Sequence, residues 1–161
     1  MGGSTRVPSK SLTDDPHDST RFVLAQQGTY ERALAEIASG TKRSHWMWYV
    51  FPQIVGLGSS APSRKYAIKS LAEAEAYLRH GTLGPRLVAC AEAALAVEGR
   101  SALQIFGSTD ELKLRSSATL FAQVAAVGSV FHRLLDKYFA GEPDEATLHI
   151  LARLGSAHPT I

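Results

Sequence analysis

The chain has 161 residues, a length that fits one globular domain with a hydrophobic core of its own. Apolar residues make up 45% and charged residues 20%, and these values exclude an intrinsically disordered chain. The net charge of +2 and the pI of about 8.8 fall short of a dedicated nucleic-acid binder, but they permit a weak attraction for small anions.

The single cysteine, Cys90, excludes an internal disulfide and a multi-cysteine zinc site. It lies in the apolar run LVACAEAALAV, which predicts a small core residue and not a catalytic thiol. The first residues, MGGSTRVPSKS, lack the apolar segment of a secretory signal, and charges interrupt every hydrophobic run. We therefore expect a soluble cytoplasmic protein.

In chain order, residues 1–17 are rich in Gly, Ser, Pro and Asp and have no apolar periodicity, so they predict a flexible tail. Asp18 or Ser19 can cap the helix that begins with RFVLAQQ. Gly28 interrupts this helix before TYERALAEIAS, whose apolar residues recur at three- and four-residue spacing. Gly40 follows as its C-terminal cap.

The second half of the chain carries further helix signals. Ser70 and Glu73 predict a capping box before LAEAEAYLRH, and RLVACAEAALAVEG is a strong helix former. After the short segment SALQIF, Ser108 and Glu111 predict a second capping box at the start of a long helix. A helical stripe returns in VFHRLLDKYF, and Asp144 caps the last helix, EATLHILARL.

Alternating strands and the Asn-Gly or Asp-Gly turns of hairpins are absent from the sequence. The prediction is an all-α fold, a single compact domain of about seven or eight helices. Residues 18–154 form this domain, and residues 1–17 and 155–161 form tails. We find neither an internal repeat nor a linker.

The segment SHWMWYVFPQIVGLGSSAPSRKY, residues 44–66, contains both tryptophans of the chain. The run from Trp46 to Phe51 is hydrophobic on every face of a helix, so we expect Trp46, Trp48 and Phe51 to be largely buried. Each buried indole N–H needs an acceptor, and His45, Gln53 and nearby carbonyls are candidates. As a purely structural element, this segment needs no ligand.

A nucleotide-binding interpretation rests on Gly56–Ala61, which matches the pattern G-x-G-x-x-A. The pattern requires a surrounding βαβ unit, whereas Pro52 breaks the preceding run and Pro62 follows at once. The sequence therefore argues against a dinucleotide fold.

A looser interpretation keeps only the chemistry of this loop. Glycine backbone, the hydroxyls of Ser59, Ser60 and Ser63 and the charges of Arg64 and Lys65 can together cradle a carboxylate or phosphate. The alternative is a flexible glycine connection with solvated basic residues. The sequence leaves both open.

Four blocks of the chain resemble the bacterial domain-of-unknown-function family 1810: GTKRSHWMWYVFPQIVGLGSSAPSRKYAI, LAEAEAYLRHGTLGPRL, IFGSTDELKLRSSATLF and LLDKYFAGEPDEATLHIL. The resemblance covers about Asp18 to Leu151 and implies a compact all-helical domain. It implies no established activity, cofactor or catalytic residue. Some members carry the automatic label calpastatin, but this chain lacks inhibitor-like repeats and is expected to be folded.

Asp110, Lys113 and Arg115 lie in the first turns of the long helix at spacings typical of surface ion pairs. In a functional alternative, Lys113 or Arg115 turns inward and joins an anion site. The histidines are scattered and show no metal-binding pair, so we expect neither a metal nor a cofactor.

These patterns favour a small anionic ligand, nucleotide-like or phosphorylated, where residues 44–53 meet residues 56–66, with hydrolysis as a further activity. His45 is the candidate acid–base residue. The alternative is a protein-interaction module with a purely structural aromatic core. We expect no membrane partner, because charges interrupt every hydrophobic run. We also expect no nucleic acid, because stacking on bases needs exposed rings. The candidate binding residues are Gln53, Ser60, Arg64, Tyr66, Lys113 and Arg115.

Overall fold

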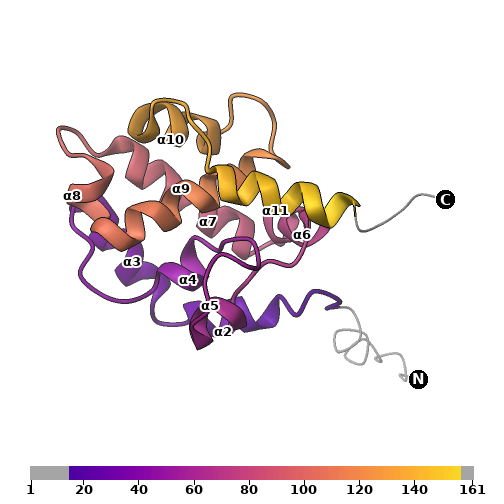
Figure 1. Cartoon of the computed structure of the whole chain (residues 1–161). Helices are drawn as coiled ribbons and strands as arrows, with labels where there is room; N and C mark the ends of the chain where they lie inside the picture. Colours follow the sequence, from indigo (N-terminus) through magenta and orange to yellow (C-terminus); the bar gives the residue numbers. More distant parts are fainter. Residues whose placement is uncertain (1–14, 157–161) are drawn as a thin grey trace, which may run out of the picture.

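Residues 15–156, the part of the chain that the computed structural model describes, contain ten helices joined by turns and loops, and no strand (Figure 1). They pack as one domain, so the predicted all-α class is confirmed. The helices are α2 (Thr20–Gln26), α3 (Tyr30–Ala38), α4 (Met47–Val50), α5 (Ala61–Lys65), α6 (Leu71–Arg79), α7 (Leu83–Ala96), α8 (Ala102–Phe106), α9 (Ser108–Ala122), α10 (Val130–Phe139) and α11 (Glu145–Ser156).

The structure has more helices than the sequence predicted because three of them, α4, α5 and α8, are only four or five residues long. Such segments are too short to show a repeating apolar face. Among the described residues, no helix is long and apolar enough to cross a membrane.

Helix α9 lies at the centre of the domain, and α6, α8, α10 and α11 pack around it (Figure 1). Residues 116–122 are all buried, although three of them are polar. The Ser116 hydroxyl donates to the Leu112 carbonyl at 3.0 Å, and the Thr119 hydroxyl donates to the Arg115 carbonyl at 2.8 Å. These bonds within the helix give two of the three buried hydroxyls a partner, whereas the Ser117 hydroxyl makes no hydrogen bond with a described residue.

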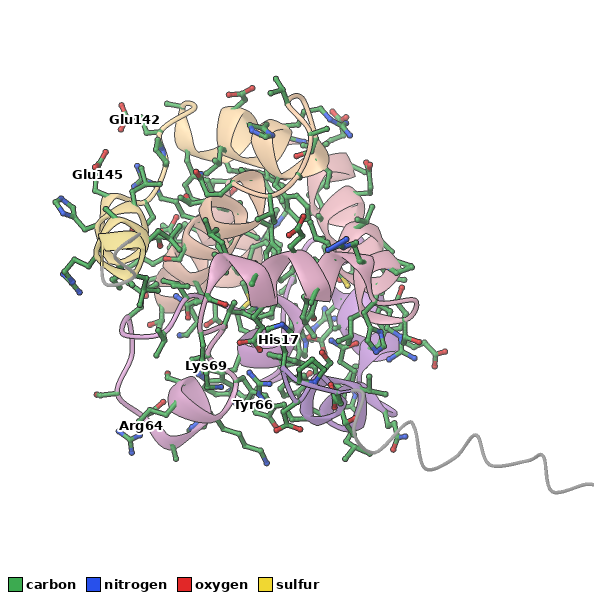
Figure 2. The ribbon with its side chains drawn as sticks, turned by 90° about the vertical axis from the view of Figure 1, so that its right-hand side faces the viewer. His17, Arg64, Tyr66, Lys69, Glu142 and Glu145 are labelled. Carbon is green, nitrogen blue, oxygen red and sulfur yellow. The ribbon has the colours of Figure 1, made fainter. Side chains whose placement is uncertain are left out.

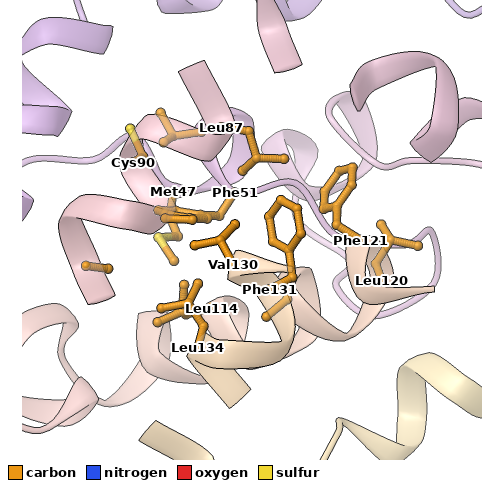
Figure 3. Packing of buried hydrophobic residues seen from close by; sticks show 14 of the residues in the cluster. Met47, Phe51, Leu87, Cys90, Leu114, Leu120, Phe121, Val130, Phe131 and Leu134 are labelled. Carbon is orange, nitrogen blue, oxygen red and sulfur yellow. The ribbon is translucent and has the colours of Figure 1, made fainter. Parts of the chain in front are cut away.

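The main core lies between α9, α10, α7 and the segment around α4 (Figure 3). Cys90 on α7 is fully buried in this core, as expected, and burial raises the pKa of its thiol to about 12. A thiol in such surroundings stays protonated and unreactive. Side chains in this part of the core include Met47, Phe51, Leu87, Leu114, Leu120, Phe121, Val130, Phe131 and Leu134.

The start of α9 differs from the sequence prediction. Its N-cap is Gly107, with φ of 90°, and no side chain caps the helix, so the capping box predicted at Ser108 and Glu111 is wrong. The capping box lies one helix earlier, where Ser101 Oγ accepts from Gln104 N at 3.1 Å and Gln104 Oε1 accepts from Ser101 N at 2.9 Å. The turn at Gly107 separates α8 from α9 and needs the left-handed region that glycine adopts easily.

The predicted capping box of α6 is half correct. Ser70 Oγ accepts from Glu73 N at 3.0 Å, but the Glu73 carboxylate accepts from Lys69 N at 2.7 Å and pairs with Arg21 at 2.9 Å. Arg21 also donates to the carbonyl of Ala67 at 2.8 Å. Both charged side chains are largely buried, so this pair fastens α2 to α6.

At each end of the domain, a carboxylate accepts hydrogen bonds from backbone N–H groups at the start of a helix. Ser19 is the N-cap residue of α2, as one of the two predicted alternatives had it, but its side chain makes no capping bond. Asp15 instead accepts from the backbone N–H groups of Ser19 and Thr20 at 2.7 and 3.1 Å. At α11, Asp144 accepts from Thr147 N at 3.0 Å, which confirms the predicted cap. Helix α11 continues to residue 156, and most of the predicted N-terminal tail lies outside the described residues.

Candidate functional site

The two tryptophans have different surroundings. Trp46 is fully buried, and its indole Nε1–H donates to Glu36 Oε1 on α3 at 2.8 Å. Trp48 is only partly buried, which corrects the expectation that both rings are largely buried. The acceptor for Trp46 is a carboxylate ten residues earlier in the chain, and neither His45 nor Gln53 supplies it.

Glu36 binds the turn that leads into the tryptophans. Its carboxylate accepts from Arg43 N at 2.9 Å, from Ser44 N at 3.1 Å and from Ser44 Oγ at 2.6 Å, in addition to Trp46. Burial alone would raise the pKa of this carboxyl, but the hydrogen bonds outweigh burial and lower the pKa from 4.5 to about 2. Glu36 is therefore ionised at neutral pH and holds the turn in place.

Two lysines are held on the same side of this turn. Lys42 Nζ lies 4.8 Å from the Trp46 ring centroid and 2.8 Å from Asp110 Oδ2. Lys113 Nζ lies 5.9 Å from the Trp48 ring centroid and 3.2 Å from Asp110 Oδ1. Each lysine thus contacts one indole face, and the two share a single carboxylate. Their side chains are only 7% and 17% exposed.

These groups line a pocket of about 350 Å³, the lysine pocket. The first turn of α9 forms one wall of the lysine pocket, so the positive end of the helix dipole lies at this wall. Because no side chain caps the helix, its first backbone N–H groups are not engaged by a cap. The residues that line the lysine pocket are Lys42, His45, Met47, Trp48, Phe106, Gly107, Ser108, Thr109, Asp110 and Lys113.

A second cavity of about 280 Å³, the loop pocket, lies between α9 and the glycine-rich loop. An isolated parallel bridge between Ile54 and Ile68 holds the two ends of this loop together. Within the loop, Ser63 approaches Gly58 so closely that a Cβ at Gly58 would lie 2.6 Å from the Ser63 oxygen. The residues that line the loop pocket are Gln53, Leu57, Gly58, Ser63, Thr109, Leu112, Lys113, Ser116, Asp144 and Ala146.

The model of the family described as "Protein of unknown function (DUF1810)" matches residues 16–151. The chain belongs to this family. It is also similar to a conserved hypothetical protein from Mycobacterium tuberculosis, solved by crystallography at 1.38 Å, with 50% identity and a TM-score of 0.84 over 86% of this chain and 99% of that one. No curated protein matches the chain.

In this DUF1810 chain, three of the predicted site residues lie at the pockets beside Trp48. His45 and Lys113 line the lysine pocket, and Gln53 lines the loop pocket. His45 is exposed at the rim of the lysine pocket. Tyr66 lines a separate narrow space together with Trp48 and Gln53, and its ring centroid lies 5.3 Å from that of Tyr49.

The other three predicted residues lie outside both pockets. Ser60 is the N-cap of α5 and accepts from Ser63 N at 3.2 Å. Arg64 is exposed, and its guanidinium donates to the Ser59 carbonyl; Figure 2 shows it pointing outward. Arg115 donates from Nε to the Glu142 carbonyl at 3.0 Å, and Figure 2 places Glu142 at the opposite end of this face from Arg64.

Of the ten residues that line the lysine pocket, eight were absent from the predicted site, among them Lys42, Trp48 and Asp110. The sequence signal for Lys42 was its place just before the tryptophan run, and for Asp110 its spacing from Lys113. Among the described residues, no group of three or more His, Cys, Asp or Glu side chains is placed to hold a metal ion.

Proposed function

We propose that this protein binds a small anionic, phosphorylated ligand in the lysine pocket. The observation that supports the proposal is the arrangement of two largely buried ammonium groups, Lys42 and Lys113, around one carboxylate, Asp110, beside a pocket of about 350 Å³. Ligand sites are commonly cavities of roughly this size with a few convergent polar groups.

The local charge favours an anion. Two ammonium groups and one carboxylate leave one positive charge, and the uncapped end of α9 adds a partial positive charge of about +0.5. Hydrogen bonds to a charged group contribute about 1.5–3 kcal/mol where water is excluded. Helix N-termini bind phosphate through their free backbone N–H groups, and Ser108 and Thr109 carry such groups at this wall.

Hydrolysis of the bound compound is a second candidate function. His45 lines the lysine pocket and makes no hydrogen bond with another residue in the described range, so its imidazole is available for proton transfer to a ligand.

The alternative, a protein-interaction module, would require a flat apolar patch, whereas this region is concave. We also propose a cytoplasmic location, which cell fractionation tests.

The test is isothermal titration calorimetry with inorganic phosphate and with pyrophosphate. We expect binding that weakens with added salt and that falls about tenfold or more in Lys113→Met, since one charged hydrogen bond is lost. Arg115→Met is the matched control, because it removes a positive charge two residues away that pairs with Glu142 outside the pocket. Equal affinity in wild type and Lys113→Met, or equal loss in both variants, would contradict the proposal.

A further inference from the structure

One face of α9 connects the lysine pocket with the loop pocket. Thr109, Leu112, Lys113 and Ser116 recur at i, i+3, i+4 and i+7, so their side chains lie along one side of the helix. Thr109 and Lys113 line both pockets. A ligand whose anionic group is held by Lys113 therefore lies beside the loop pocket.

The loop pocket offers neutral hydrogen-bonding groups. Asp144 is already committed to the cap of α11, and the Ser116 hydroxyl donates to a backbone carbonyl of its own helix. By contrast, the Gln53 carboxamide and the Thr109 hydroxyl make no hydrogen bond with any residue in the described part of the chain. Both groups can donate and accept, which suits ligand hydroxyls that also do both.

The walls of the loop pocket do not suit a nucleobase. Among residues 15–156, no aromatic side chain lines it, although stacking on rings is the usual way for a protein to hold a base. Trp48 borders the lysine pocket instead, where Lys113 lies over its ring. The volume of about 280 Å³ fits a compact group.

We infer that the ligand is a phosphorylated sugar or polyol. Its phosphate binds Lys42, Lys113 and the first turn of α9, and its hydroxyl-bearing part lies in the loop pocket against Gln53 and Thr109. This inference rests on the proposed function and adds the ligand class. It replaces the nucleotide-like compound that the glycine-rich loop indicated in the sequence.

The experiment compares inorganic phosphate, ribose 5-phosphate and adenosine monophosphate by isothermal titration with the full chain. We expect ribose 5-phosphate to bind about tenfold tighter than phosphate, since two added hydrogen bonds to neutral groups are enough for this gain. The base should add nothing, so adenosine monophosphate should bind no tighter than ribose 5-phosphate. Gln53→Leu should lower the affinity for ribose 5-phosphate to nearly that for inorganic phosphate, and it should leave the affinity for inorganic phosphate unchanged.

Gln27→Leu serves as the control, because Gln27 is exposed at the end of α2 and lines neither pocket. Equal affinity of wild type for phosphate and ribose 5-phosphate overturns this inference but leaves the proposed function standing. The same follows if Gln53→Leu weakens both probes equally. Tighter binding of adenosine monophosphate by about tenfold assigns a nucleotide and overturns the sugar class. Failure of all three probes to bind overturns the proposed function as well.

Discussion

Replacing Glu36 by Gln should destabilise the protein in a pH-dependent way. The carboxylate accepts four hydrogen bonds, from Arg43 N, Ser44 N, Ser44 Oγ and Trp46 Nε1, and an amide presents an N–H₂ donor in place of one acceptor oxygen. A carboxyl whose pKa falls from 4.5 in the unfolded chain to about 2 in the folded one contributes about 3 kcal/mol to the free energy of unfolding at neutral pH.

The sign follows from the lowered pKa. The contribution is fully present above pH 4.5 and is lost as the pH falls toward 2, because the unfolded chain takes up the proton first. The difference between wild type and Glu36→Gln should therefore be about 3 kcal/mol at pH 7 and roughly half of that at pH 3.

Urea unfolding followed by tryptophan fluorescence measures this difference at each pH. Glu31→Gln is the control, because Glu31 is exposed on the same helix, and it should change the free energy of unfolding by about 0.5 kcal/mol or less. If Glu36→Gln lowers the free energy of unfolding equally at pH 7 and pH 3, or by no more than Glu31→Gln does, the account of the Glu36 carboxylate is refuted.

Three further changes test other parts of the structure. Gly58→Ala should lower the free energy of unfolding by about 1–3 kcal/mol in thermal or urea unfolding, because its Cβ would lie 2.9 Å from that of Ser63; Gly81→Ala, which has open space, should not. His80→Ala should lower the free energy of unfolding by about 1 kcal/mol in the same assay, because His80 Nδ1 accepts from the N–H groups of Thr82 and Leu83 at the start of α7. His80→Asp should retain most of the stability, since its carboxylate can accept from the same groups. Cys90 should resist a thiol reagent in the native state and react once urea unfolds the chain, and rapid native labelling would contradict its burial.

Helices such as α3 and α10 were predictable, because their apolar faces repeat over two or more turns. The capping pattern was less reliable. Ser-x-x-Glu at Ser108 and Ser-x-x-Gln at Ser101 look alike in sequence, and only the turn at Gly107 makes the earlier one the capping box. A cap depends on backbone angles at the boundary, which a short pattern does not specify.

The candidate site shares the tryptophan run with the predicted one, but its other wall is the start of α9 and not residues 56–66. The run of aromatic residues drew attention to residues 44–66, and Lys113 was proposed to turn toward it. The pairing of Lys42 with Asp110 and of Trp46 with Glu36 depends on how α3 and α9 pack beside this run. Arg64 and Lys113 are both basic residues on helices, and only tertiary packing separates the exposed side chain from the one at the pocket.

The measurement that tests the central proposal most directly is an NMR titration of the ¹⁵N-labelled chain with inorganic phosphate. The chain has only two indole N–H signals, and one of them, from Trp46, is fixed by Glu36. We predict saturable shifts of the Trp48 indole and of the backbone amides of residues 108–110, with an affinity that salt weakens and that falls about tenfold or more in Lys113→Met. Shifts confined to other parts of the chain, or no saturable shift at all, would contradict the lysine pocket as an anion site.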